Sequence, residues 1–89
     1  MKVNKNFVVR QIADEYIIVP IGEAVINFNG MVTVNEVGKF IWQQLYDDLA
    51  QDELLQRIIQ EYDIDEQTAA EDMEEFLEKL KQGGLLQQK

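Results

Sequence analysis

The residue types that most often carry out chemistry in proteins are scarce in this chain. It has no histidine and no cysteine, so the commonest general bases, nucleophiles and soft metal ligands are missing. Asp63 and Asp65 have the spacing of the first two ligands of a calcium loop, but no glycine follows at the required position. The five glycines match neither a dinucleotide nor a phosphate-loop fingerprint. The sequence therefore predicts no catalytic residue, no metal site and no cofactor, and we expect a protein that is not an enzyme.

Carboxylates are the one abundant reactive group, and they are unevenly distributed. Residues 1–46 carry four basic and four acidic side chains, whereas residues 47–89 carry four basic and thirteen acidic ones, so the net charge of −9 lies in the second half. Most of these carboxylates fall on expected solvent-facing helix positions, where solvation accounts for them. The acidic half either serves solubility or selects basic or neutral partners. It repels phosphate backbones, which argues against a nucleic-acid partner.

Length and composition limit the class of protein. Eighty-nine residues are enough for one domain, which we expect to span residues 1–89. No stretch approaches the roughly 18 apolar residues of a membrane span, and residues 1–6 have no apolar signal core. The lack of cysteine excludes a disulfide scaffold. We expect a cytoplasmic protein with no membrane partner.

The first third of the chain is expected to form strands. Phe7–Ile12 and Tyr16–Val19 are rich in β-branched and aromatic residues, and the short segment between them suits a hairpin turn. A second pair, Ala24–Phe28 and Met31–Val34, is joined by Asn29-Gly30, the strongest short hairpin signal. Together these segments predict a small antiparallel sheet of three or four strands.

From Asn35 onward the apolar residues follow a helical period. Asn35 and Asp65 are good N-cap residues, while Ala50 offers no capping side chain where the middle helix should begin. Gly83 supplies a C-terminal stop. The expected helices cover Glu36 to Asp47 or Asp48, Gln51 to Tyr62, and a third from the Asp65 cap to Gly83.

Several helix residues carry specific expectations about packing. Gly38 inside the first helix suggests close approach to a neighbouring backbone. Trp42 and Tyr46 form a second, partly exposed stripe, for which packing in the core is favoured over a binding surface. Glu75 and Lys79 have the spacing of an i,i+4 ion pair. The buried face of the third helix is expected to comprise Ala69, Met73, Phe76, Leu77 and Leu80.

The order of these elements and three short motifs resemble the PqqD-like family, also called RiPP recognition elements, over about residues 7–86. The first motif is the hairpin Phe7–Ile12 with Tyr16–Pro20, and the second is Val34-Asn35-Glu36 with Ile41-Trp42, similar to the family's "LNE…IW" junction. The third, similar to its "DV..FL..L…GLL" ending, comprises Asp72-Met73, Phe76-Leu77, Leu80 and Gly84-Leu85-Leu86.

This resemblance implies an α+β fold of the winged helix-turn-helix type, with a small antiparallel sheet followed by three helices. It also implies a peptide chaperone that binds the leader segment of a ribosomally made precursor peptide by strand addition. The partner would be a modifying enzyme, in many relatives a radical S-adenosylmethionine enzyme. Carried over to this chain, the leader would lie along Met31, Val32, Thr33 and Val34 and against Thr68, Glu71, Asp72 and Glu75.

Other functions remain open at this point. A winged-helix nucleic-acid-binding or transcription-regulatory module shares the fold, but the third helix is the most acidic element rather than a basic one. A protein–protein assembly module without a peptide ligand is the other alternative. The sequence does not decide whether the 24–34 hairpin leaves the edge of the sheet open, and it names neither the precursor nor the oligomeric state.

Overall fold

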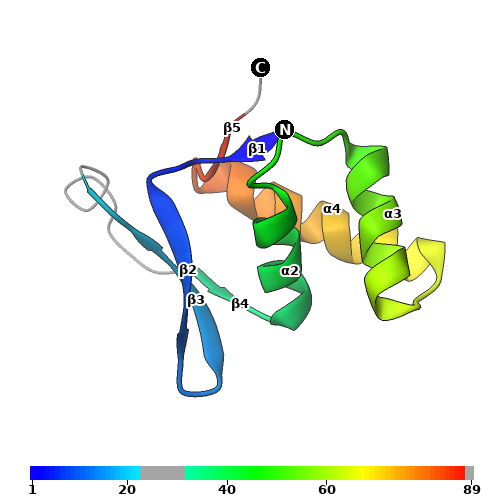
Figure 1. The fold of residues 1–89 in the computed structure, drawn as a ribbon, viewed down its shortest axis with the longest axis horizontal. Helices are drawn as coiled ribbons and strands as arrows, with labels where there is room; N and C mark the ends of the chain where they lie inside the picture. Colours follow the sequence, from blue (N-terminus) through cyan, green and yellow to red (C-terminus); the bar gives the residue numbers. More distant parts are fainter. Residues whose placement is uncertain (23–31, 88–89) are drawn as a thin grey trace.

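The computed structural model describes residues 1–22 and 32–87 and has the α+β class that the sequence predicts (Figure 1). Its strands are β1 (Lys2–Val3), β2 (Phe7–Ile12), β3 (Glu15–Pro20), β4 (Val32–Val34) and β5 (Leu86–Gln87). Its helices are α2 (Glu36–Gln44), α3 (Gln51–Tyr62) and α4 (Glu66–Gln82). The predicted strand Ala24–Phe28, the Asn29-Gly30 turn and Met31 lie outside the described residues.

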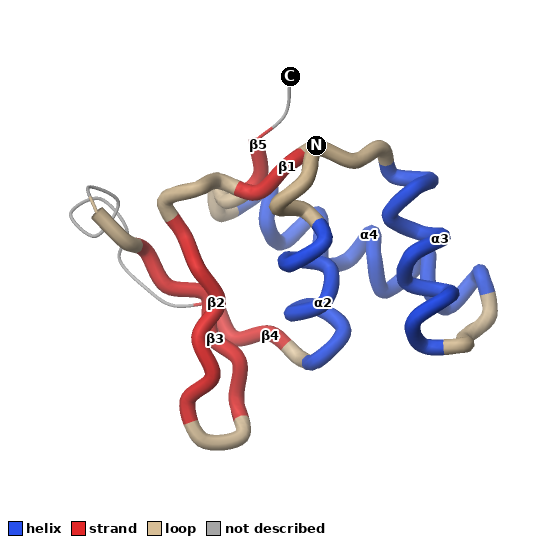
Figure 2. Tube along the Cα trace, in the orientation of Figure 1, coloured by secondary structure: helices blue, strands red, loops and turns tan. Residues whose placement is uncertain are grey.

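Strands β2, β3 and β4 form one antiparallel sheet, as predicted, and they lie in that order (Figure 2). Ile12 pairs with Glu15, so only Ala13 and Asp14 remain in the turn and β3 begins one residue earlier than expected. β4 follows β3 in the sheet, with Ile17 opposite Thr33. The sheet thus places the short β4 directly before α2.

A second sheet, which the sequence did not predict, joins β1 to β5 near the two ends of the chain (Figure 1). The first helix was expected to end at Asp47 or Asp48, but it stops at Gln44. The residues of β1 and Met1 before it account for this early end. In a continued helix the Leu45 carbonyl would accept from the Leu49 N–H. Instead it accepts from the Val3 N–H at 2.9 Å, while the Leu49 N–H donates to the Met1 carbonyl at 2.9 Å.

Each helix begins where the sequence predicts. The Asn35 side chain accepts from the Gly38 N–H at 2.8 Å, and an Asp65 carboxylate oxygen accepts from the Thr68 N–H at 3.0 Å. Ala50 has no capping oxygen, and the only side-chain contact at its N–H is a 3.4 Å bond donated to Glu53. Two of the three starts are therefore capped by the side chain expected from the sequence.

The end of α4 is a Schellman turn in which Gly84, not Gly83, carries the left-handed conformation, with φ at +72°. The Leu85 N–H donates to the Leu80 carbonyl at 2.9 Å, and the Gly84 N–H donates to the Lys81 carbonyl at 3.2 Å. This turn directs Leu85 back into the core, where it is fully buried.

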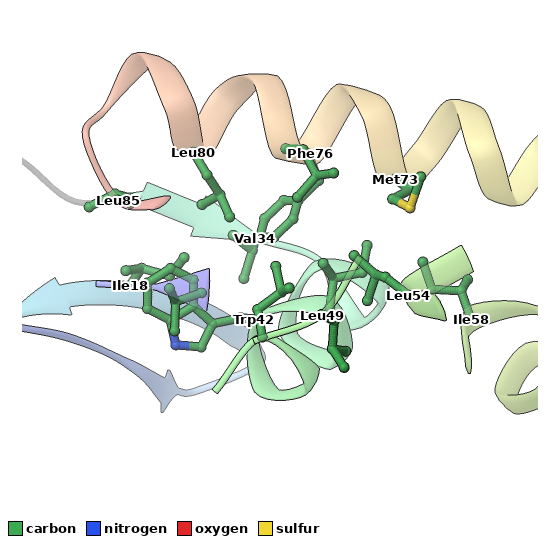
Figure 3. Close-up of a cluster of buried hydrophobic side chains, with 14 of the residues drawn as sticks. Ile18, Val34, Trp42, Leu49, Leu54, Ile58, Met73, Phe76, Leu80 and Leu85 are labelled. Atoms are coloured by element: carbon green, nitrogen blue, oxygen red, sulfur yellow. The ribbon is translucent and has the colours of Figure 1, made fainter. Parts of the chain in front are cut away.

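The buried side chains form one cluster between the sheet and the helices (Figure 3). The predicted buried face of α4 is confirmed at all five positions. Trp42 is fully buried, in agreement with the favoured core packing, and its Nε1 donates to the hydroxyl of the exposed Tyr46 at 3.2 Å. Along the described residues, we find no helix whose length and hydropathy would allow it to cross a bilayer.

Gly38 is packed closely, as predicted, but against side chains rather than a backbone. A methyl group at this position would stand 3.0 Å from Phe76 Cε1 and 3.1 Å from Val34 Cβ. The missing side chain therefore lets α2 lie close to both α4 and β4. Figure 3 shows Val34 beneath α4, near Phe76 and Leu80.

Candidate functional site

One edge of the three-stranded sheet is formed by β4, which within the described residues pairs with β3 alone. On the side away from β3, the Thr33 carbonyl accepts a hydrogen bond from Lys79 Nζ of α4 at 3.1 Å. The N–H and C=O of one residue in an antiparallel strand point to the same side of the strand. The Thr33 N–H therefore also faces α4, so both polar backbone groups of Thr33 lie at the edge that no other described strand covers.

A groove of about 250 Å³ runs between this edge and α4. Its floor is apolar and buried, and it is made by Val34, Gly38, Ile41 and Phe76, with the half-buried Val37 beside them. Its rim is polar and exposed, and it is made by Thr33, Asn35, Asp72, Glu75 and Lys79. Within the part of the chain that the structure describes, the groove thus combines an unpaired strand edge, an apolar floor and side chains of both charges.

Four of the eight site residues predicted from the sequence line this groove: Thr33, Val34, Asp72 and Glu75. Val32, which pairs with Ile18 and packs against the core, does not line it. Thr68 and Glu71 lie on α4 but outside the groove: Thr68 bonds to Asp65, and Glu71 accepts from Gln67. Met31 is outside the described residues. Whether any of these residues contacts a ligand remains a prediction.

The groove meets α4 from Asp72 to Lys79, a length that matches the short β4. Three strand residues span only about 10 Å, which corresponds to about two helical turns. The groove therefore reaches Phe76 and Lys79, which the sequence-based prediction missed, rather than Thr68. Helical spacing contains the signal for both, since Phe76 and Lys79 follow Asp72 by four and seven residues and share its face.

Lys79 also departs from its expected partner. The spacing predicted an ion pair with Glu75, but among the described residues no carboxylate lies within 4 Å of Lys79. Its ammonium instead reaches the Thr33 carbonyl, 46 residues away in sequence. The rim of the groove thus holds two carboxylates, from Asp72 and Glu75, and an ammonium that bonds to the strand edge.

Chemically, this arrangement is suited to holding an extended chain. Thr33 presents a donor and an acceptor to the groove, and the apolar floor can accommodate side chains. Across residues 1–22 and 32–87, no three carboxylates are grouped in a way that could hold a metal ion. No buried side-chain polar atom in the same residues lacks a hydrogen-bond partner.

Comparisons with known proteins give the same fold. The solved structure of TbiB1 in complex with the TbiA(beta) leader peptide resembles this chain with a TM-score of 0.74 and 26% sequence identity. The alignment covers 100% of this chain and 98% of TbiB1. No curated protein matches the sequence.

The family comparison matches most of the chain. Residues 15–86, from the first residue of β3 to the start of β5, match the family model of coenzyme PQQ synthesis protein D, PqqD. The match includes β4, α2 and α4, the three elements that build the groove. The chain therefore belongs to the PqqD family.

Proposed function

We propose that this chain is a RiPP recognition element that binds the leader segment of a ribosomally made precursor peptide. The observation that carries the proposal is the open edge of β4, where both backbone groups of Thr33 face the groove beside α4. A leader in extended conformation would add to the sheet as a further strand at this edge. Its side chains would alternate between the apolar floor and solvent.

The resemblance to TbiB1 supports the same function. TbiB1 was solved with a leader peptide, and its fold covers the whole of this chain. Membership of the PqqD family agrees with a peptide-binding role. In this proposal Thr33, Val34, Asp72 and Glu75 contact the leader, as the sequence predicted, and Gly38, Phe76 and Lys79 complete the groove.

The chain is proposed to act without catalysis of its own, as a carrier for an enzyme that modifies the core of the precursor. The absence of histidine and cysteine from the sequence supports this role. A radical S-adenosylmethionine enzyme is the proposed partner, on the strength of the family resemblance. This partner would supply the cofactors and the reactive chemistry.

Isothermal titration calorimetry tests the proposal directly. Synthetic leaders from precursor genes that neighbour the gene for this chain are titrated into the protein. We expect saturable binding, together with NMR shift changes centred on β4 and α4. If none of these leaders produces heat or shift changes, the proposed function is wrong.

The strand-addition geometry has its own test in Thr33→Pro. Proline removes the Thr33 N–H, which faces the open edge, and proline is tolerated on edge strands. We expect leader affinity to fall about tenfold, because one backbone hydrogen bond is lost and the proline ring adds bulk at the edge. Thr33→Val is the matched control, because it alters the side chain but keeps the N–H. Equal affinities for the folded proline and valine variants would place the leader elsewhere.

A further inference from the structure

Lys79 occupies the very acceptor that an added strand would need. Its ammonium donates to the Thr33 carbonyl at 3.1 Å from the opposite wall of the groove. Lys79 is exposed, and no carboxylate in the described part of the chain lies within 4 Å of its ammonium. A bond between an exposed ammonium and a carbonyl is easily exchanged, because water or another donor can replace either partner.

We infer that Lys79 selects bound peptides by charge and favours those with a carboxylate opposite it. This inference rests on the proposed function and concerns the same groove. When a peptide strand adds to β4, its N–H takes the Thr33 carbonyl and Lys79 is released. The released ammonium remains at the rim, where a carboxylate on the peptide becomes its partner.

The charges along α4 define a pattern for this peptide. Asp72 and Glu75 come first on the groove wall, and Lys79 follows one turn after Glu75. Glu75 and Lys79 are about 6 Å apart along the helix axis. Alternate residues of a strand, which point to the same face, are about 6.7 Å apart.

The two spacings agree well enough for one peptide strand to meet both charges. The structure thus favours an extended peptide with one basic and one acidic side chain two residues apart, the basic one near Glu75 and the acidic one near Lys79. This sharpens the expectation of a neutral or basic partner that the acidic second half of the chain suggested. The occupant is a zwitterionic strand rather than a uniformly basic one.

Selection of peptides from a phage-displayed library of random linear peptides tests the pattern even when the natural leader has not been identified. The library is selected on the wild type, on Lys79→Glu and on Lys81→Glu. Lys81 is the matched control, since it is exposed on the same helix turn but does not line the groove. We expect the wild type and Lys81→Glu to enrich an acidic residue two positions from a basic one, and Lys79→Glu to replace that acidic residue with a basic one.

Binding measurements on one enriched peptide give the coupling energy between its acidic residue and Lys79. Changing its acidic residue to the amide should weaken binding to the wild type about threefold to fivefold, as expected for an exposed ion pair, and leave binding to Lys79→Met nearly unchanged. In the free protein, Lys79→Met should shift the Thr33 carbonyl carbon resonance, and Lys81→Met should not.

The possible failures are distinguishable. If peptides bind but Lys79→Glu enriches the same charges as the wild type, Lys79 is not a specificity residue and the proposed function stands. An unmoved Thr33 carbonyl resonance in Lys79→Met would remove the exchange step on which the inference depends. If the library gives no extended peptide and the neighbouring leaders give no heat, the proposed function fails and this inference fails with it.

Discussion

Asp65 shows how one side chain can fix a helix start and make it sensitive to pH. Hydrogen bonds from the Thr68 N–H and then from its hydroxyl hold the pKa of Asp65 below its usual value of 3.8. In the unfolded chain the carboxyl titrates near that usual value. Its stabilising contribution is therefore complete above pH 3.8 and is lost as the pH falls through the lower, folded-state pKa.

We predict that the Asp65→Asn variant loses less stability than the wild type when the pH is lowered. Asparagine keeps a capping oxygen but cannot be protonated in this range, so the contribution from Asp65 titration disappears. The measurement is the urea midpoint from about pH 5 to about pH 2, compared between wild type and variant. Glu74→Gln, which removes one charge from the exposed side of α4, is the control and should follow the wild type. If Asp65→Asn follows it as well, the cap does not titrate as described.

At the scale of elements, the groove depends on how closely α2 approaches α4 and β4. Gly38→Ala tests this approach. Inside a helix, alanine is more favourable than glycine by about 1 kcal/mol. Its methyl group, however, would stand 3.0 Å from Phe76 and 3.1 Å from Val34, so these two residues of the groove floor must shift by a few tenths of an ångström.

Because the two effects oppose each other, we predict a stability within about 1 kcal/mol of the wild type, but a leader affinity lower by about fivefold. Urea unfolding and calorimetry measure the two quantities separately. Gly83→Ala is the control: its nearest neighbours would be 3.5 Å away and its φ is −86°, so affinity should not change. A Gly38→Ala variant that binds like the wild type would show that the floor accommodates the methyl group.

The elements that the sequence predicted are those with local signals. The buried face of α4 follows from the helical period, and the Asn35 and Asp65 caps follow from residue type. The β1–β5 pair was missed because strands of two residues have no periodicity, and the early end of α2 was missed because it depends on that pair. The contact between Lys79 and Thr33 joins residues 46 positions apart, and no local pattern encodes it.

For the molecule as a whole, charge separates peptide binding from the nucleic-acid binding that its fold class also permits. The net charge is −9, and several cations already have partners within the chain. Lys39 lies 4.6 Å from the centre of the Tyr16 ring, Arg57 donates to Gln44 at 2.9 Å, and Lys79 bonds to Thr33. Exposed α4 positions are mostly acidic, so this helix offers no basic row for a phosphate backbone.

We therefore predict that a fluorescently labelled DNA duplex shows no saturable anisotropy change with up to about 100 μM protein, even at low salt, where phosphate contacts are strongest. Winged-helix proteins that bind DNA neutralise phosphates with lysine and arginine, and their affinity rises steeply as salt is lowered. The control is the same protein sample with a leader, whose proposed hydrogen bonds to β4 would need no counterion release. Saturable duplex binding that weakens with salt would instead favour the nucleic-acid alternative, since a net charge of −9 could then be overcome only by a local basic surface.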